Sequence, residues 1–416
     1  MRKGICCLTV ALYINVLFVY SQANAIMEDM CGTYKLYPIQ EKEVTMPPLG
    51  YEPVFINHVG RHGSRYPVSE ESLKLIQEEL NKQKSFDNLN ADGEKLLINI
   101  NHIIDRCQNN WGGLSSIGAE EQTGIAQRFK AAYGQDLFRK VRCWIDPQKR
   151  CVESYESFFK GLSEVLPFQP VIDETKMVRQ NNILNFFVYN QSYDKYKKSG
   201  NWISEYKLYE SEQLEKINLL NRYVKDTKEV NVHIQQSFDL ALFNVWAIAP
   251  NISLPYSERP KLASDEIYHF WLVQNARQYL EKGPSPIAGG IQQNISIPLL
   301  KQFIDTSEEN LKTKNYGGFF RFAHAETIIP FAALLKIPEA SEATSVTSDI
   351  AEVWKDYIVS PMAANIIWVF YQNKKGNVLI QMLLNEKEVE FPIPTDNFPF
   401  YEWPKVRRYY QDMYSL

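Results

Sequence analysis

The hydrophobic pattern near the start of the chain predicts one buried strand and the helix that follows it. Residues 54–59 (Val-Phe-Ile-Asn-His-Val) are rich in β-branched and aromatic side chains and are bounded by proline and glycine, which is typical of a buried strand. Ser69 is placed as an N-cap, with Glu70 and Glu71 in the first turn of a helix that runs past Leu80.

Strands and helices alternate further along the chain. Residues 115–130 predict a helix, residues 141–145 a strand, and the apolar side chains of 152–162 recur at helical spacing. A strand over 318–322 and a helix through 331–335 repeat the pattern. Such alternation indicates an α/β sheet with crossover helices.

The last part of the chain predicts an antiparallel hairpin. Residues 366–371 and 378–384 are strand-like and are separated by the turn sequence Asn-Lys-Lys-Gly-Asn. Together, these elements predict an α/β fold with an open mixed sheet flanked by helices.

The stretch 163–301 has a different character. It is aromatic and polar, has helical pieces at 211–225 and 266–279, and gives few strand signals. We therefore expect a mostly α-helical cap inserted into an α/β core formed by 26–162 and 302–416. Ligands of open α/β sheets bind at the carboxyl ends of the strands, so we expect the chemistry there, in a cleft between core and cap.

The composition fits a folded chain and argues against one class of partner. Of the 416 residues, 45% are hydrophobic and 23% are charged, so a large core can form without a metal or disulfide. A nucleic-acid-binding domain would be basic overall, whereas the formal net charge is −4. A small basic pocket for a phosphorylated ligand is compatible with this charge.

Residues 1–25 have the parts of a cleavable signal peptide. Arg2 and Lys3 supply the positive end, an apolar stretch follows, and Ala-Asn-Ala at 23–25 gives the pattern that signal peptidase reads. A membrane anchor is the alternative, but it needs about 20 uninterrupted apolar residues, and no later segment is long and apolar enough either. We expect a secreted, extracellular protein with no membrane span.

The cysteines and glycosylation sequons agree with secretion. Four cysteines remain after signal cleavage: Cys31, Cys107, Cys143 and Cys151. An even number in an oxidising compartment predicts two disulfides, whose connectivity the sequence leaves open. Sequons for N-glycosylation begin at Asn190, Asn251 and Asn294.

A basic motif follows the first predicted strand. Residues 61–67 read Arg-His-Gly-Ser-Arg-Tyr-Pro, so two arginines flank a histidine at the carboxyl end of a strand. Guanidinium groups match phosphate oxygens in bidentate geometry and stay charged at working pH. His62 is placed to attack the phosphorus of a phosphate that Arg61 and Arg65 orient. A basic surface turn is the alternative, but the whole pattern after an apolar strand is specific.

These residues resemble the histidine acid phosphatases, which share R-H-G-x-R-x-P and use its histidine as a covalent nucleophile. Most members carry His-Asp after a later strand. This chain carries His-Ala-Glu at 324–326, the version typical of the multiple inositol polyphosphate phosphatase branch. Further matches at 114–118, 150–162 and 279–283 extend the resemblance over nearly all of the chain that follows the signal.

The resemblance implies a role for each matching residue. It makes His62 the nucleophile and Glu326 the proton donor. It implies that the phosphoryl group is bound, during its transfer, by four residues: Arg61, Arg65, Arg150 and His324. Fixed cations suit a phosphoryl group whose charge spreads over three oxygens, and an alkoxide leaving group needs a proton. The alternatives are a helix-start cap for Arg150 and a structural strand-end pair for His324 with Glu326.

No metal or cofactor is expected, because the arginines neutralise the charge that a metal ion neutralises elsewhere. The other histidines are assigned structural roles: His58, His102, His233 and His269.

The chain departs from the family in two places. Residues 144–149 read Trp-Ile-Asp-Pro-Gln-Lys where relatives carry a Ser/Thr-rich stretch, so the loop before Arg150 is expected to sit differently. Cysteines that many relatives carry in the cap and near the C-terminus are missing, so the disulfide pattern of relatives does not transfer.

Substrate choice rests on cations beyond the reacting centre. Lys195, Lys197 and Lys198 on the predicted cap are candidates for the remote phosphates of an inositol polyphosphate, and a solvated charged patch is the alternative. Three functions stay open. The preferred one is hydrolysis of inositol polyphosphates through a phosphohistidine. The others are broad acid phosphatase activity and non-catalytic binding of phosphorylated small molecules.

Overall fold

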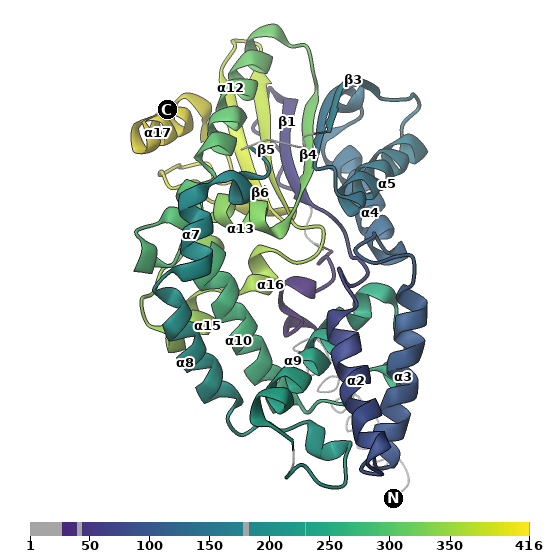
Figure 1. Ribbon diagram of the computed structural model, residues 1–416. Helices are drawn as coiled ribbons and strands as arrows, with labels where there is room; N and C mark the ends of the chain where they lie inside the picture. Colours follow the sequence, from purple (N-terminus) through teal and green to yellow (C-terminus); the bar gives the residue numbers. More distant parts are fainter. Residues whose placement is uncertain (1–26, 40–43, 178–182, 229, 416) are drawn as a thin grey trace, which may run out of the picture.

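The computed structural model describes residues 27–39, 44–177, 183–228 and 230–415, which form an open sheet and a helical half beside it (Figure 1). The signal peptide expected over 1–25 lies outside the described residues. The strands are β1 (Tyr51–Arg61), β2 (Lys140–Ile145), β3 (Val171–Met177), β4 (Gly318–Ala323), β5 (Asn365–Asn373), β6 (Val378–Leu384), β7 (Lys387–Val389) and β8 (Tyr401–Glu402).

The strand order of the sheet is β3-β2-β4-β1-β5-β6-β7, with β8 beside β6. Neighbours among β3, β2, β4 and β1 pair in parallel, and β5, β6 and β7 pair antiparallel. The mixed sheet is therefore confirmed. The carboxyl ends of β1, β2 and β4 meet at one edge, where ligands of such sheets bind.

Helices cover both faces of the sheet and build the other half of the molecule. The longer ones are α2 (Glu71–Ser85), α3 (Ala91–Cys107), α4 (Ser116–Tyr133), α5 (Lys149–Val165), α7 (Gln191–Ser199), α8 (Trp202–Leu214), α9 (Val232–Ile248), α10 (Ser264–Lys282), α12 (Ile297–Thr313), α13 (Ala325–Leu334) and α17 (Trp403–Tyr414). The short ones are α6 (Phe186–Tyr189), α11 (Ile291–Asn294), α14 (Pro338–Ser341), α15 (Ile350–Val353) and α16 (Asp356–Val359).

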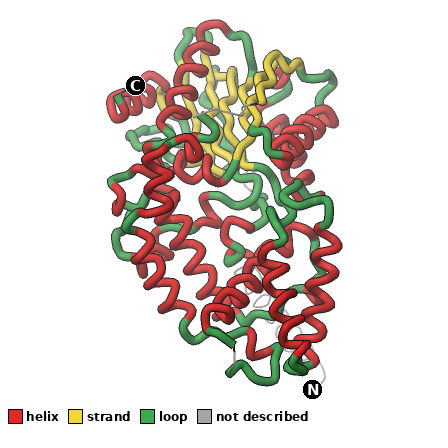
Figure 2. The backbone as a smooth tube through the Cα atoms, viewed as in Figure 1, coloured by secondary structure: helices red, strands yellow, loops and turns green. Residues whose placement is uncertain are grey.

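Each face of the sheet has its own hydrophobic core. On one face, α4 and α5 pack on the sheet, and on the other α12, α13 and α17 do so (Figures 1 and 2). The core under α4 and α5 encloses His58, whose ring lies among Phe129, Phe158, Phe320 and Phe322. Burial and nearby Arg321 lower the pKa of His58 to about 3, so it is a neutral core residue, in agreement with its predicted structural role.

The helical half is not one continuous stretch of sequence. Helices α2 and α3 precede the range 163–301, yet α2 packs against α9 in the helical half (Figure 1). Strand β3 lies inside that range and pairs with β2 in the sheet. The domain division at 163 and 301 stays a prediction, but that range does not contain all the helices of this half.

Most predicted elements are present, with shifted ends. Strands β1, β2 and β4 and the β5–β6 hairpin are confirmed, and Ser115 caps α4 by accepting a hydrogen bond from the Gly118 backbone N–H. The N-cap prediction for Ser69 is wrong by one residue, because α2 begins after Glu70. The helix predicted over 211–225 is wrong, since α8 ends at Leu214 and the chain then turns.

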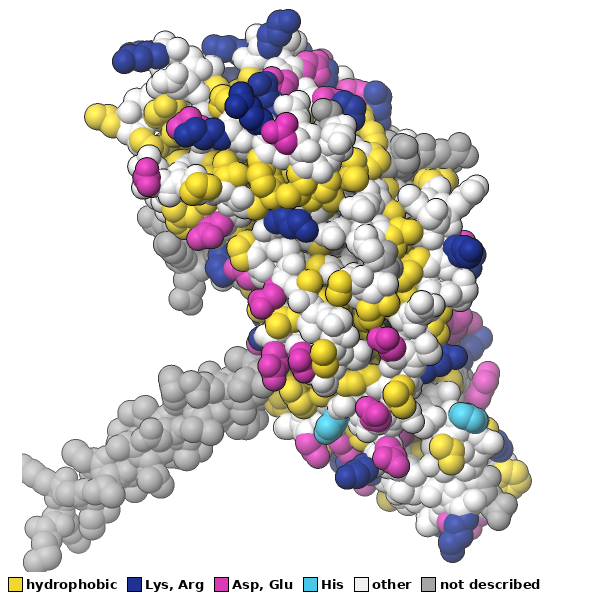
Figure 3. Space-filling model, turned by 90° about the vertical axis from the view of Figure 1, so that its left-hand side faces the viewer, with side chains coloured by type: hydrophobic (Ala, Val, Ile, Leu, Met, Phe, Trp, Pro, Cys, Tyr) yellow, Lys and Arg dark blue, Asp and Glu magenta, His cyan; other side chains and the backbone are white. Residues whose placement is uncertain are grey.

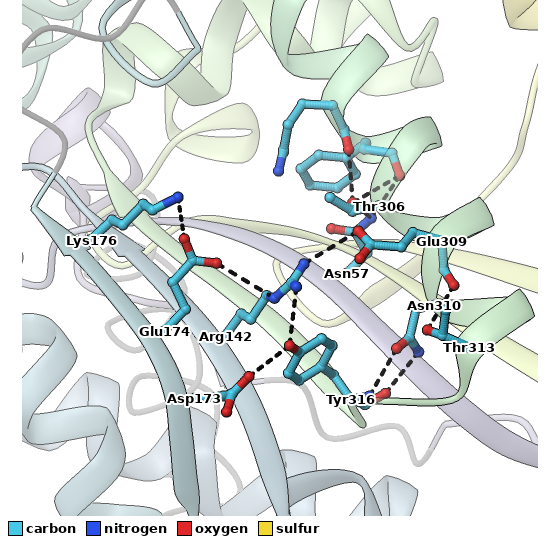
Figure 4. A network of polar contacts seen from close by, with 12 residues as sticks. Asn57, Arg142, Asp173, Glu174, Lys176, Thr306, Glu309, Asn310, Thr313 and Tyr316 are labelled. Atoms are coloured by element: carbon cyan, nitrogen blue, oxygen red, sulfur yellow. Dashed lines mark hydrogen bonds and ion pairs between the residues drawn. The ribbon is translucent and has the colours of Figure 1, made fainter.

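Strand β3 is anchored by a polar network at the amino-terminal edge of the sheet (Figure 4). The Tyr316 hydroxyl donates to Asp173 Oδ2 at 2.6 Å and accepts from Arg142 Nη2 at 3.0 Å. Arg142 also donates to Glu309 Oε2 on α12 at 3.3 Å. A hollow of about 340 Å³ beside Lys140 and Tyr316 lies at this edge, and none of the predicted site residues lines it.

The cysteine prediction is wrong. All four cysteines in the described residues are free and buried, and they lie in separate places: just before the 3-10 turn Gly32–Tyr34, in α3, in β2 and in α5. Burial raises the pKa of the thiols of Cys31 and Cys107, to about 12 and about 11. The even number of cysteines does not show whether any two of them lie close enough in the fold to form a disulfide.

One of the three predicted glycosylation sites is contradicted. Asn251 is fully buried, and its amide nitrogen donates to the Tyr34 carbonyl oxygen at 2.7 Å, so that nitrogen cannot carry a glycan in this fold. Asn294 is exposed and Asn190 is partly exposed, so these two stay predictions.

The charges on the surface and the hydrophobicity of the helices are relevant to which partners the protein can have. On the face in Figure 3, Lys and Arg side chains are interspersed with Asp and Glu. No helix in the described parts of the chain is long and apolar enough to cross a membrane.

Candidate active site

The sheet topology brings the two predicted motifs together. His62 follows β1 and His324 follows β4, and these strands are parallel neighbours with Arg61 in register with Ala323. The His62 backbone N–H donates to the Ala323 carbonyl at 3.0 Å, and the two imidazole rings lie 5.5 Å apart between centroids. Residues that lie far apart in the sequence thus share one buried site.

The hydrogen bond of His62 defines which ring nitrogen is free. Nδ1 lies 2.9 Å from the carbonyl oxygen of Gly63, and a carbonyl can only accept, so Nδ1 carries the proton. Burial, followed by the charges of Arg61 and Arg150, lowers the pKa of His62 well below its ordinary value. The imidazole is therefore neutral, and Nε2 keeps a lone pair for nucleophilic attack.

Helix α4 approaches the His62 loop so closely that only glycines fit. A Cβ on Gly63 would lie 2.5 Å from the Gly118 carbonyl oxygen, and one on Gly118 would lie 2.1 Å from the Ser64 carbonyl oxygen. The Gly63 backbone N–H also donates to Ser154 Oγ on α5 at 3.1 Å. Two helices thus fix the backbone that carries the nucleophile.

Glu121, one turn after Gly118 in α4, also holds this loop. Its carboxylate accepts from the Ser64 backbone N–H at 2.7 Å, from the Ser64 hydroxyl at 2.9 Å and from the Tyr37 backbone N–H at 2.9 Å. Burial raises the pKa of Glu121, although these hydrogen bonds oppose the increase. The loop is therefore pre-organised by a partly buried carboxylate.

We expect Gly118→Ala to lower both stability and activity. The added methyl would meet the Ser64 backbone, so the loop or the helix must move, and overpacking of this kind costs about 1–3 kcal/mol. Gly124→Ala in the same helix is the matched control, because its methyl would meet only the end of the flexible Arg128 side chain. Thermal unfolding and turnover of the two variants measure the effect. Equal behaviour of both would contradict the close approach.

Three arginines surround the nucleophile, and two of them, Arg61 and Arg65, are buried while Arg150 is partly buried. Each has an Nε–H group without a hydrogen-bond partner in the described residues: Arg61, Arg65 and Arg150. Arg61 is anchored by Nη1, which donates to the carbonyls of Thr33 and Ser360 at 2.7 Å each. Burial and neighbouring Arg65 lower the pKa of Arg61 to about 10, so it stays charged at neutral pH. Buried donors of this kind are suited to phosphate oxygens.

His324 is held between two charged residues. Its Nε2 lies 3.0 Å from Asp146 Oδ1, and its Nδ1 lies 3.4 Å from Arg150 Nη2. The Cys151 thiol donates to the Ala323 carbonyl at 3.2 Å and lies 3.7 Å from His324 Nε2. The predicted phosphate ligands Arg61, Arg65, Arg150 and His324 therefore lie in one cluster with His62, and the loop before Arg150 supplies an extra carboxylate to it.

One group in the described residues has metal-ligand character. The donor atoms of Asp146, Cys151 and His324 lie within 4.8 Å of one another. The thiol and the imidazole keep their protons in hydrogen bonds, since Cys151 donates to the Ala323 carbonyl and His324 Nε2 donates to Asp146. We therefore derive no step of the chemistry through a metal.

Glu326 lies in the first turn of α13 and pairs with a lysine. Its Oε1 is 3.0 Å from Nζ of Lys282 at the end of α10, which also donates to Gln278 at 2.9 Å. Burial would raise the pKa of Glu326, but the charge and hydrogen bond of Lys282 hold it well below its ordinary value. The free protein thus carries an ionised Glu326, whose side chain is 37% exposed and accessible to a ligand.

The three cap lysines do not form one cluster at the site. Lys197 is the inward one: its Nζ lies 3.4 Å from the Phe187 carbonyl, and the Phe187 ring lies 6.3 Å from the His324 ring. Lys198 is exposed and pairs with Asp194 at 2.7 Å, and Lys195 is exposed.

Sequence reasoning missed several residues of this site: Asp146, Glu121, Ser154 and Lys282. A signal for Asp146 was available, because it directly follows a predicted strand just as His62 and His324 do. Glu121 and Ser154 lie inside helices, and their contacts to the loop come from packing. Lys282 lies in the family-like segment 279–283, but that match assigned it no role.

Comparison with known proteins agrees with this geometry. A family model of the histidine phosphatase superfamily (branch 2) matches residues 54–385, which is most of the chain. The chain belongs to this superfamily. By family it is a phosphatase, a hydrolase of phosphoric monoesters, and the resemblance drawn from the two motifs is confirmed. No match was found among curated proteins.

Solved structures similar to this phosphatase have the same fold. The multiple inositol polyphosphate phosphatase of Bifidobacterium longum, in complex with inositol hexasulfate, has a TM-score of 0.78 at 20% identity. The match covers 91% of this chain and 97% of that chain. The phytase from D. castellii has a TM-score of 0.69 at 16% identity, covering 93% of this chain and 85% of that one.

Proposed function

We propose that the protein hydrolyses phosphomonoesters of inositol polyphosphates through a phosphohistidine intermediate on His62. The observation that carries this proposal is the neutral His62, whose free Nε2 is surrounded by Arg61, Arg65 and Arg150 and by His324. Such a cluster both holds a phosphoryl group and supplies the nucleophile for it.

The first half-reaction is attack on phosphorus. Nε2 of His62 forms a bond to phosphorus while the P–O bond to the inositol oxygen breaks, and the arginines stabilise the charge on the three equatorial oxygens. Glu326 gives a proton to the departing alkoxide, which is a poor leaving group without one. Because Glu326 is ionised in the free protein, it must first gain that proton. The negative phosphoryl group of the substrate favours this protonation.

The second half-reaction restores the enzyme. Water attacks phosphorus, the Glu326 carboxylate accepts the water proton, and the P–N bond to His62 breaks as phosphate forms. The acid of the first step is the base of the second, so one carboxyl group serves both. We propose that the arginines make a metal ion unnecessary for either step.

The substrate class is supported by named relatives and by one lysine. Structures similar in fold include a multiple inositol polyphosphate phosphatase and phytases. Lys197 contacts the Phe187 carbonyl, and the Phe187 ring lies beside His324, so we expect Lys197 to reach a second phosphate of a molecule bound at His324. Secretion stays a prediction, since the N-terminal segment lies outside the described residues.

We expect Lys197→Ala to raise KM for inositol hexakisphosphate by up to about fivefold, because an exposed ion pair contributes up to about 1 kcal/mol. KM for an aryl monophosphate should not change, since that substrate does not reach Lys197. Lys198→Ala is the matched control, as Lys198 already pairs with Asp194 in solvent. The effect should shrink at high ionic strength. Equal shifts for Lys197→Ala and Lys198→Ala would place both lysines in a solvated patch.

One assay tests the function as a whole. Phosphate release is measured from inositol hexakisphosphate and from an aryl phosphate, both in EDTA, with product isomers resolved. We expect efficient release from the inositol substrate at an unchanged rate in EDTA. Preference for the aryl ester alone would support a broad acid phosphatase, and binding without turnover would support a non-catalytic binder. Loss of activity in EDTA that zinc or magnesium restores would overturn metal independence.

A further inference from the structure

Asp146 is a buried carboxylate beside a residue of the phosphate site, and the mechanism above does not use it. It follows β2 directly, and its backbone N–H donates to the Phe322 carbonyl at 3.0 Å, which ties the end of β2 to the end of β4. Its Oδ1 lies 3.0 Å from His324 Nε2. Asp146 is 2% exposed and His324 is 3% exposed, so water does not screen this contact.

The carboxylate is itself fixed in place. Its Oδ2 accepts from Asn185 Nδ2 at 2.6 Å, and its Oδ1 accepts from the Gln148 backbone N–H at 2.9 Å. Burial would raise the pKa of Asp146, but hydrogen bonds from His324, Gln148 and Asn185 hold it below its ordinary value. Asp146 is therefore a rigid negative charge at the back of the phosphate site.

This geometry determines how His324 can bind an anion. Because the carboxylate accepts from Nε2, that nitrogen always carries a proton, and Nδ1 is the one that faces Arg150. In the free protein, Nδ1 can accept from Arg150 Nη2 at 3.4 Å, which requires a neutral imidazole. To donate to a phosphate oxygen instead, Nδ1 needs a proton of its own, and the ring then carries a positive charge.

We propose that Asp146 is a positioning residue that lets His324 bind the phosphoryl group as an imidazolium. Phosphate binding then adds one proton to Nδ1, the Arg150 guanidinium turns from the ring to the phosphate, and Asp146 is the buried counter-ion of the new charge. The proposal rests on the phosphate site of the proposed function and adds a specific coupling between proton uptake and phosphate binding.

The other charges around His324 do not supply this counter-ion. Its charged or titratable neighbours are Arg150 and Cys151 on α5, His62 after β1, Glu326 on α13, and Asp146 after β2. Arg150 is cationic, His62 is neutral, and burial keeps the Cys151 thiol protonated by raising its pKa. Glu326 is negative, but it pairs with Lys282 and must be protonated to act as the acid. Only Asp146 of this set stays negative throughout the reaction.

The test measures binding of inorganic phosphate as a function of pH. It uses Asp146→Asn in a Glu326→Gln background, so that Glu326 takes up no proton. The amide keeps the shape of Asp146 and can still accept from His324 Nε2, but it removes the charge. Asp239→Asn in the same background is the matched control, because Asp239 is also buried and accepts from a backbone N–H in the helical half. If Asp146→Asn does not fold, Asp146→Ser replaces it.

We expect phosphate affinity to fall with rising pH in the Glu326→Gln parent. In Asp146→Asn the phosphate affinity should fall at a pH about one to two units lower, because the imidazolium has lost its counter-ion. Between the two transitions, the dissociation constant of the variant should exceed that of the parent by about 10-fold for each pH unit that separates them. Calorimetry in buffers of different ionisation heat should show fewer protons taken up near neutral pH. Asp239→Asn should match the parent.

Two outcomes would overturn the proposal while leaving the proposed function intact. One is a loss of affinity by the same factor at every pH, which indicates a structural role only. The other is an equal pH shift when Asp146→Asn is made in a His324→Ala background, since Asp146 would then act through another residue. Failure of the wild-type protein to bind phosphate or to hydrolyse phosphomonoesters would instead contradict the proposed function itself.

Discussion

His62→Ala is expected to reduce turnover by at least about 10⁴-fold, because removal of a covalent nucleophile leaves no alternative group to form the intermediate. The loss should appear with both inositol hexakisphosphate and an aryl phosphate, since both substrates depend on the same bond to Nε2. Phosphate release under saturating substrate is the measurement. Phosphate binding should be retained in large part, because the arginines that hold it stay in place.

The control for this variant is His102→Ala. His102 is exposed on α3, so its removal should leave activity unchanged. The pH profile of the wild type is a second check. Because the pKa of His62 lies well below its ordinary value, the nucleophile should stay neutral and active as the pH falls below the ordinary pKa of a histidine. Near-normal turnover of His62→Ala would exclude His62 as the nucleophile.

Glu326→Gln is expected to lower kcat/KM for inositol phosphates by about 10²- to 10⁴-fold, the usual contribution of a general acid. The amide keeps the shape of the side chain but cannot release the proton that an alkoxide needs. An aryl phosphate has a better leaving group and should lose much less, because kcat/KM reports only the steps up to the release of the alcohol. The comparison of the two substrates is the measurement.

The pH dependence gives this prediction a definite sign. In the free protein, Lys282 keeps the pKa of Glu326 low, so the protonated acid becomes more abundant as pH falls. We expect kcat/KM for inositol phosphates to rise toward acid pH in the wild type and to lose this rise in Glu326→Gln. Glu339→Gln is the matched control, because Glu339 also pairs with a lysine, Lys387, but at the surface. Equal losses on both substrates would mean that Glu326 serves binding or geometry.

The sequence predicted the centre of the fold and the centre of the site for one physical reason. Buried parallel strands give strong apolar signals, and the residues that follow them must meet at one edge of the sheet. His62 and His324 were therefore predicted to lie together. Asp146 also directly follows a buried strand, but it was not predicted as a site residue. Strand β3 was missed because its sequence, Val-Ile-Asp-Glu-Thr-Lys-Met, is charged and mostly exposed at the edge of the sheet.

The failures concern interactions that no local pattern encodes. The helix predicted over 211–225 ends at Leu214, and beyond it the Leu219 backbone N–H donates to the buried Asp239 carboxylate, a contact between distant residues. The disulfide prediction counted cysteines but had no information on their separation. The glycosylation prediction at Asn251 recognised a tripeptide but not its burial. The pairing of Glu326 with Lys282 joins α13 to α10, and only the folded structure shows it.

The most direct test of the central claim is to trap the phosphoenzyme. Glu326→Gln should accept phosphate from a labelled aryl ester but hydrolyse the intermediate slowly, because the base of the second step is absent. Rapid quenching without acid, followed by mass localisation of the label, should find the phosphoryl group on His62 and no label in the His62→Ala/Glu326→Gln double variant. Label on a carboxylate, or continued turnover of the aryl ester with no covalent label at any time, would contradict the phosphohistidine mechanism.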